Sequence, residues 1–157
     1  MGLQQDLKRP VPFASLQQET LVNLLRIGDQ LDNRFSRLFR ESGLTLSRFN
    51  VLRILVLADR PLTCGEIGER MIHIVPAITS LVDHLEKQAL VERQRCVEDR
   101  RVVYVRITQA GRKLCESAMA PLGEVEQRLL NKLTHGELKA LRGLLDKVRE
   151  SISAAEV

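Results

Sequence analysis

The sequence predicts a mainly α-helical fold of about six helices with a single two-stranded β-hairpin. Three observations carry this prediction: apolar residues recur at helical spacing along most of the chain, capping signals mark helix starts, and one short β-branched run alternates at residues 101–107. The chain has 157 residues and is 44% hydrophobic, which is enough for one ordinary core. We therefore expect a single domain over residues 1–157.

Two helices are expected first. Ser15 and Gln18 form an S-x-x-Q capping box before a long apolar stripe that closes at Gly43, so the first helix should cover residues 15–43. The second should begin near Thr45 or Ser47 and end at the turn before Pro61, because the residue that precedes a proline disfavours helix.

Two shorter helices should follow. Thr63 and Glu66 form another capping box, which predicts a helix of about two turns. Pro76 suits the first position of a fourth helix that ends near Gln88, because its missing N–H would be unpaired there in any case. The inward face of this fourth helix reads Ile78, Leu81, Val82 and Leu85.

The hairpin is expected at residues 90–107, with strands at 90–96 and 101–107 around a polar loop. The rest reads as one helix from Thr108 to Leu129, perturbed at Pro121, and a last helix that Thr134 caps. Two short helices followed by a hairpin describe an α+β winged helix-turn-helix over residues 45–107, whose second short helix enters the major groove of DNA.

Positive charge is concentrated at the hairpin. The segment Val91–Lys113 holds seven basic and three acidic residues, a net +4 that equals the charge of the whole chain. Such a patch fits a polyanionic partner, and it also fits a solvated hairpin with charged edges. With no Trp and 3% aromatic residues, the chain offers no stacking platform for single-stranded nucleic acid or sugars.

Three stretches carry a resemblance to a known family. Residues 81–93 (LVDHLEKQALVER), 98–101 (EDRR) and 105–111 (VRITQAG) resemble the LVDxLExxGLVER run, DRR wing tip and VxLTxxG junction of MarR-family transcriptional regulators. The similarity extends more loosely over residues 16–152. It implies a homodimer held by residues 15–43 and 108–152, a pseudo-palindromic double-stranded DNA operator, and a repressor modulated by a small ligand. Family members often bind aromatic or phenolic acids, but no residue here identifies the pocket.

The dimer also has a physical argument. The apolar stripes at both chain ends exceed what one small winged helix could cover, so a second copy is the simplest cover. The alternative is a monomeric bundle in which these helices pack only on each other.

The predicted recognition helix departs from the family. The family usually has Ser and Arg before the proline and another Arg after the Thr, whereas this chain has Ile74, Val75 and Ser80. Its DNA-facing set can contact thymine methyl groups but cannot read guanine with a planar charged donor. That set is Val75, Pro76, Ala77, Thr79 and Ser80. Specificity from wing and DNA shape, together with apolar readout of A·T-rich sites, is the favoured interpretation. The alternative function is a winged-helix protein-interaction module with weakened DNA binding.

The wing should therefore carry much of the DNA binding. By resemblance Arg101 is the wing arginine, and an arginine at a hairpin tip can enter a narrow minor groove. Asp99 is expected to orient its guanidinium, while Arg95 and Arg100 face phosphates. The plainer alternative is that Asp99 and Arg101 form only an ion pair that stabilises the hairpin.

No chemistry of an enzyme is apparent. The histidines lack chelating spacing, and we read Asp83 and Glu86 as salt-bridge partners of the hairpin arginines, so no catalytic group, metal or cofactor is predicted. The three cysteines form no CxxC pair; Cys64, at a helix start, is the best candidate for a redox thiol, although a plain half-buried residue is the more common case. With no membrane-spanning run and no signal peptide apparent, the expected location is the cytoplasm.

Overall fold

The computed structural model describes residues 2–155 and divides the chain into two compact units, Met1–Ala118 and Met119–Val157. Within the described residues it contains eight helices and one three-stranded sheet, which confirms the mainly helical winged fold. None of the helices in this range is long and apolar enough to cross a membrane. The first helix, α1 (Leu3–Asp6), is a single turn that the sequence analysis missed.

The two predicted N-terminal helices are confirmed as α2 (Leu16–Arg40) and α3 (Leu46–Ala58). The Ser15 hydroxyl accepts a hydrogen bond from the Gln18 N–H at 3.1 Å, but the Gln18 side chain accepts from the Ala14 N–H, one residue earlier than in a standard capping box. After α2 the chain turns at Gly43, whose φ of +72° is a left-handed conformation that glycine adopts without steric cost.

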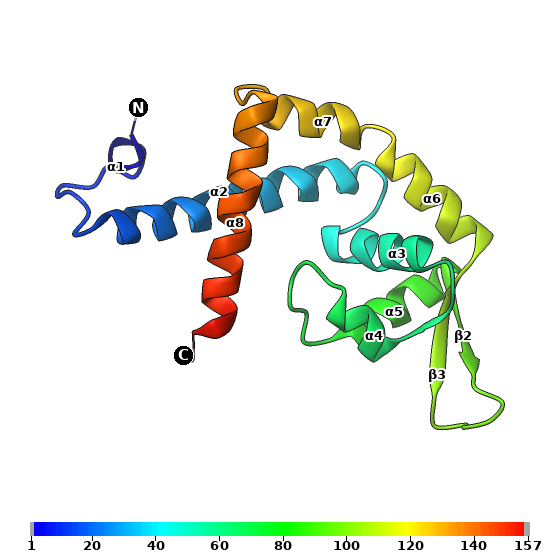
Figure 1. Cartoon of the computed structure of the whole chain (residues 1–157). Helices are drawn as coiled ribbons and strands as arrows, with labels where there is room; N and C mark the ends of the chain where they lie inside the picture. The colour runs from blue at the N-terminus through cyan, green and yellow to red at the C-terminus, as the bar shows by residue number, and fades with distance from the viewer. Residues whose placement is uncertain (1, 156–157) are drawn as a thin grey trace. The chain divides into compact units, whose positions relative to one another are not determined.

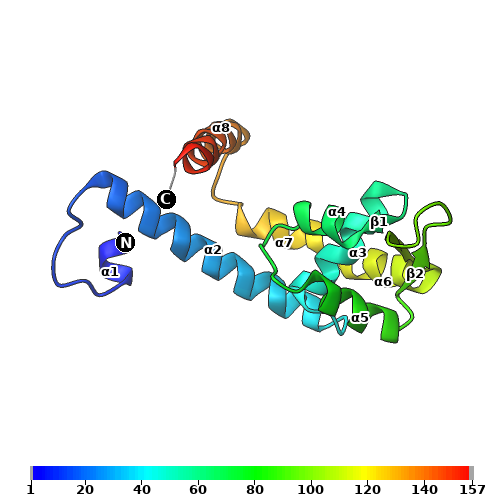
Figure 2. The ribbon, with the colours of Figure 1, turned by 90° about the horizontal axis from the view of Figure 1, so that it is seen from below.

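The core of the first unit lies around α3. Val51, Leu52 and Leu55 on this helix are essentially fully buried, and they pack with residues of the neighbouring helices and sheet. The other large side chains that are fully enclosed are Phe39, Leu62, Ile67, Leu85, Val82, Val91, Val105 and Cys115. Figures 1 and 2 show α3, α4 and α5 gathered beside the sheet, beyond the C-terminal end of α2.

The two short helices are α4 (Cys64–Glu69) and α5 (Ile78–Lys87). The predicted capping box of α4 is complete, with Thr63 and Glu66 each accepting from the other's backbone N–H. The start of α5 was predicted wrongly, because the helix begins at Ile78 rather than at Pro76. Pro76 and Ala77 instead form a turn before the helix, and Ala77 occupies the N-cap position with no side-chain acceptor.

The wing is confirmed as the antiparallel pair β2 (Val91–Arg95) and β3 (Val103–Ile107). The two-stranded prediction was incomplete, because β1 (Leu62–Thr63) pairs with β3 on its other side and gives the order β1-β3-β2. A two-residue strand has no periodicity to detect, and only its pairing of Leu62 with Val105 defines it.

The predicted helix from Thr108 to Leu129 is wrong as a single element. It is divided into α6 (Gln109–Met119) and α7 (Leu122–Leu129), because Pro121 has no N–H to donate and its ring clashes with the preceding turn. The last helix, α8 (His135–Ala154), begins at the predicted Thr134 cap. Neither α7 nor α8 contains a buried residue, so their leucines remain accessible.

Candidate nucleic-acid interface

The helix α5 presents one apolar and one polar face. Val82 and Leu85 are fully buried against the rest of the first unit, whereas Thr79 and Ser80 are exposed. The other three residues of the predicted recognition set precede the helix: Val75 is half-buried, and Pro76 and Ala77 are exposed. The set is therefore a short loop followed by the first turn of a helix.

The beginning of α5 is open. Within the described residues no side chain caps it, so the N–H groups of its first turn keep their hydrogen-bonding capacity. Oriented N–H groups and the helix dipole favour an anion such as a phosphate at this end. Farther along, His84 Nδ1 lies 2.8 Å from the Ser80 carbonyl oxygen, which keeps the imidazole along its own helix.

Arg93 joins α5 to the base of the wing. From β2, its guanidinium lies 2.6 Å from Asp83 and 2.5 Å from Glu86, and its backbone N–H donates to Glu86 at 3.0 Å. Partial burial disfavours the charged form, but the hydrogen bonds to Asp83 and Glu86 outweigh it and raise the pKa of Arg93. The predicted salt bridges of these two acids are thus confirmed, and Arg93 is neutralised rather than available to a polyanion.

The tip of the wing is a tight turn organised by Asp99. Its carboxylate accepts a hydrogen bond from the Arg101 N–H at 2.9 Å, and its carbonyl accepts from the Val102 N–H at 3.0 Å. Among the described residues no ion pair within 4.0 Å joins Asp99 to the Arg101 guanidinium. Asp99 therefore sets the direction of Arg101 through the backbone, and the guanidinium stays exposed.

A groove of about 590 Å³ joins the wing tip to α5. Arg101 lines it together with Thr79 of α5 and Cys64 at the start of α4. The fold thus brings together two members of the predicted DNA-binding set that are far apart in sequence. Arg95 and Arg100 do not line this groove, and both are exposed on the wing.

Some residues of this region were missed by the sequence analysis. Ile72 and Ile74, in the loop before α5, are 79% and 100% exposed. The sequence pattern that could have identified them is a pair of apolar residues that belong to no helical stripe. From the same loop, His73 Nε2 lies 3.4 Å from Asp32 of α2. This loop therefore offers apolar contact area next to the predicted recognition residues.

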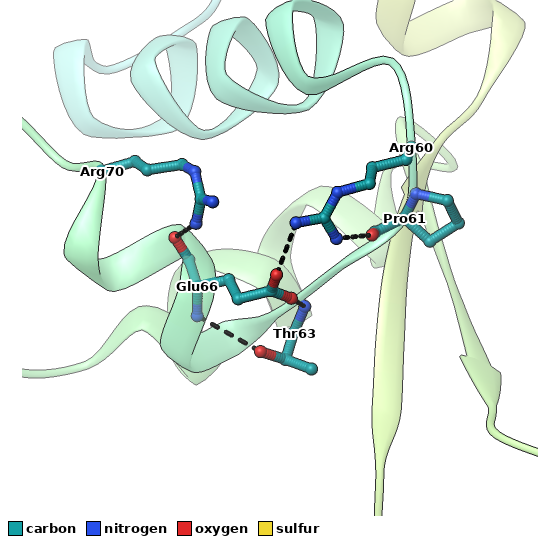
Figure 3. A network of polar contacts seen from close by, with 5 residues as sticks. All are labelled: Arg60, Pro61, Thr63, Glu66 and Arg70. Carbon is teal, nitrogen blue, oxygen red and sulfur yellow. Dashed lines mark hydrogen bonds and ion pairs between the residues drawn. The ribbon is translucent and has the colours of Figure 1, made fainter. Parts of the chain in front are cut away.

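The polar network that supports α4 was only partly predicted. Figure 3 shows Glu66, whose carboxylate accepts from the Thr63 N–H at 2.8 Å and from Arg60 at 2.7 Å, and Arg70, which donates to the Glu66 carbonyl at 2.5 Å. The Thr63 N–H and then the Arg60 guanidinium lower the pKa of Glu66 to about 2. Spacing predicted the cap, but not Arg60, which comes from the preceding turn.

The cysteines differ in environment. Cys64 and Cys96 are half-buried, and Cys115 is fully buried, where desolvation raises the pKa of its thiol. Cys64 is thus half-buried, the more common case named from the sequence, and its redox role stays only a candidate.

Comparison with known proteins agrees with this geometry. Residues 42–102, which contain α3, α4, α5, β2 and the wing tip, match the model of the MarR family. The chain is 29% identical over 125 residues to the HTH-type transcriptional repressor IacR of Pseudomonas putida, covering 80% of this chain and 74% of that protein.

Solved structures give the same result. The structure of wild-type MarR from E. coli superimposes with a TM-score of 0.68 and 26% identity, covering 88% of this chain and 98% of that one. The S. aureus MepR–DNA complex shares the fold, with a TM-score of 0.74 and 23% identity over 83% of this chain and 96% of that one. The fold and interface thus define a winged-helix transcriptional regulator. The winged-helix part of the chain, residues 42–102, is thus of the MarR type.

Proposed function

We propose that this regulator is a repressor that binds double-stranded DNA with α5 in the major groove and the wing in the adjacent minor groove. The observation that carries the proposal is the groove shared by Arg101 and Thr79, because it makes wing tip and helix one continuous surface. The repressor IacR and the DNA complex of MepR, both similar to this chain, support the assignment.

The wing and the helix have different tasks in this proposal. Arg101 enters the minor groove, Arg95 and Arg100 contact phosphates, and the open start of α5 accepts another phosphate. Val75, Pro76, Ala77, Thr79 and Ser80 contact base edges. None of these five carries a charged planar donor, so the operator should be A·T-rich with shallow preference at each major-groove position.

A second copy of the chain completes the proposed molecule. The segments 15–43 and 108–152 of one regulator domain expose large apolar side chains on α2 and α8, and a self-complementary contact would bury them. The most exposed of these are Leu16, Leu21, Leu25, Leu144 and Ile152. The dimer would place two copies of α5 on a pseudo-palindromic site.

The regulator acts in the cytoplasm without enzymatic activity. A small ligand, of the aromatic or phenolic kind by family resemblance, shifts the spacing of the two copies of α5.

The test is the salt dependence of binding to duplex DNA, measured by fluorescence anisotropy with duplexes selected from a random pool. Each phosphate contact contributes about 0.9 to the slope of log K against log salt, so Arg100→Ala should lower the slope by about one per subunit and weaken binding to all duplexes alike.

Lys132→Ala is the matched control, because it removes the same charge from the exposed segment between α7 and α8. The slope of log K against log salt for Lys132→Ala should equal that of the wild type. If the wild-type protein shows no salt-dependent affinity for any duplex, the DNA-binding proposal fails and the protein-interaction module becomes the better interpretation.

A further inference from the structure

A second pocket, of about 500 Å³, lies at the base of the wing, at the opposite end of β3 from the tip. Three arginines line it, namely Arg60, Arg106 and Arg112, and three apolar side chains contribute to its wall, namely Leu55, Pro61 and Ile107. All of these residues belong to the first unit. The pocket shares no lining residue with the groove between α5 and the wing tip.

The sheet assembles this pocket from separate parts of the sequence. The pairing of Leu62 with Val105 places the turn at Arg60 and Pro61 beside the end of β3. Arg106 comes from β3 itself, and Arg112 comes from the first turn of α6. The basic residues of the segment 91–113 thus lie in two places. Arg100 and Arg101 are at the wing tip, whereas Arg106 and Arg112 are at the wing base.

The three guanidiniums are held in different ways. Arg60 donates to the Pro61 carbonyl at 3.1 Å and to Glu66 at 2.7 Å, which fixes its position and leaves other N–H donors for a ligand (Figure 3). Arg112 lies 3.2 Å from Asp59, whose side chain is 84% exposed, so this pair is weak and easily exchanged for a ligand.

Arg106 is the most available of the three. Glu92 stands opposite it in the strand register, yet no acid within the described residues lies within 4.0 Å of its guanidinium. The acids around the pocket are thus Asp59, Glu66 and Glu92, and only the first lines it.

We propose that this pocket binds a small organic anion, a carboxylate whose apolar body contacts Leu55, Pro61 and Ile107. Guanidinium groups present paired donors that match a carboxylate, and the apolar wall favours a ligand with a hydrocarbon part. The volume lies within the usual range of about 300–1,000 Å³ for small-molecule sites. The site is independent of DNA binding, because it is formed within one chain and away from the wing tip.

The experiment is calorimetric titration of the full chain, without DNA, using cyclohexanecarboxylate and acetate as probes with the same anionic head. Cyclohexanecarboxylate should bind saturably and more tightly than acetate. Arg106→Gln should weaken it by about tenfold, because a charge-assisted hydrogen bond is lost. Arg100→Gln, which removes the same charge from the wing tip, should leave its affinity unchanged. The proposal is overturned if no saturable binding occurs, if acetate binds equally well, or if both variants lose affinity alike.

Duplex DNA provides the second arm, since Arg106 could instead serve the phosphate backbone. Arg106→Gln should keep its duplex affinity within about twofold of the wild type, while Arg100→Gln loses affinity. An equal loss of duplex affinity in both variants would make Arg106 a contact of the phosphate backbone and overturn the proposed independence of this site from DNA binding. If no variant or wild-type protein binds duplex DNA but cyclohexanecarboxylate binds as expected, the proposed function fails and this inference stands.

Discussion

Arg100 and Arg101 are consecutive exposed residues, but the wing turn gives them different surroundings. Asp99 accepts from the backbone N–H of Arg101, and Arg101 lines the groove toward α5, which Arg100 does not. An arginine in a narrow minor groove senses groove width, whereas a phosphate contact does not depend on sequence. The two side chains should therefore contribute differently to specificity.

Arg101→Ala should lose about tenfold more affinity on operators flanked by A-tracts than on the same operators flanked by G·C pairs. Asp99→Ala should lose part of the same preference, because the Arg101 backbone is no longer held, and the two changes together should be less than additive. Anisotropy titrations of operators with each of the two flanks measure these affinities. Arg100→Ala is the control, and it should lose affinity equally for both operators. Equal losses on both flanks for Arg101→Ala would mean that Arg101 contacts only phosphate.

At the level of the element, α4 depends on the ionised form of Glu66. Its pKa is held at about 2 by the Thr63 N–H and Arg60, below the ordinary value of 4.5. Because the folded-state pKa is depressed, the stabilisation is complete above about pH 4.5 and is lost as the pH falls toward 2.

Glu66→Gln should therefore lower the melting temperature at pH 7. At pH 3 the difference in melting temperature between this variant and the wild type should be smaller. Thermal unfolding followed by circular dichroism at both pH values measures this. Glu69→Gln, an exposed residue of the same helix, should change neither value appreciably. A constant difference between Glu66→Gln and the wild type at both pH values would contradict the role of the carboxylate charge.

The junction between β3 and α6 depends on a close approach at Gly111. A Cβ atom at this position would lie 2.1 Å from the Leu90 carbonyl oxygen, which is backbone and cannot move aside cheaply. Gly111→Ala should therefore reduce the free energy of unfolding by about 1–3 kcal/mol. Urea denaturation measures this. Gly65→Ala in α4 is the control, because its Cβ would have only an ordinary contact at 3.8 Å with Thr63, and an equal loss there would remove the steric argument.

At the scale of the whole molecule, the accessible leucines of α2 and α8 predict a dimer. Sedimentation at micromolar concentration should give twice the chain mass of 17.8 kDa. Leu144→Glu, at a position 59% exposed in the single chain, should shift the equilibrium toward monomer, because it would place an unpaired charge in an apolar interface. Lys139→Glu on the polar side of α8 should leave the dimer intact. A wild-type monomer at this concentration would contradict the proposed architecture.

Much of the fold was predictable because its signals are local. Thr63 with Glu66 and Thr134 with Glu137 form caps within one turn, and the alternation at residues 103–107 defines a strand without reference to any partner. The salt-bridge role of Asp83 and Glu86 was also predictable, because acids on a helix beside a basic hairpin need counter-charges.

The sequence by itself determined α2 to α5, the last helix, the wing and the concentration of charge on it, since each follows from the properties of neighbouring residues. Only the tertiary structure decided that Arg93 is neutralised, that Arg101 and Thr79 line one groove, and that Arg60, Arg106 and Arg112 line another pocket. These outcomes depend on pairings between distant segments, above all that of Leu62 with Val105. Such a pairing depends on how the whole core packs, so the local sequence contains no signal for it.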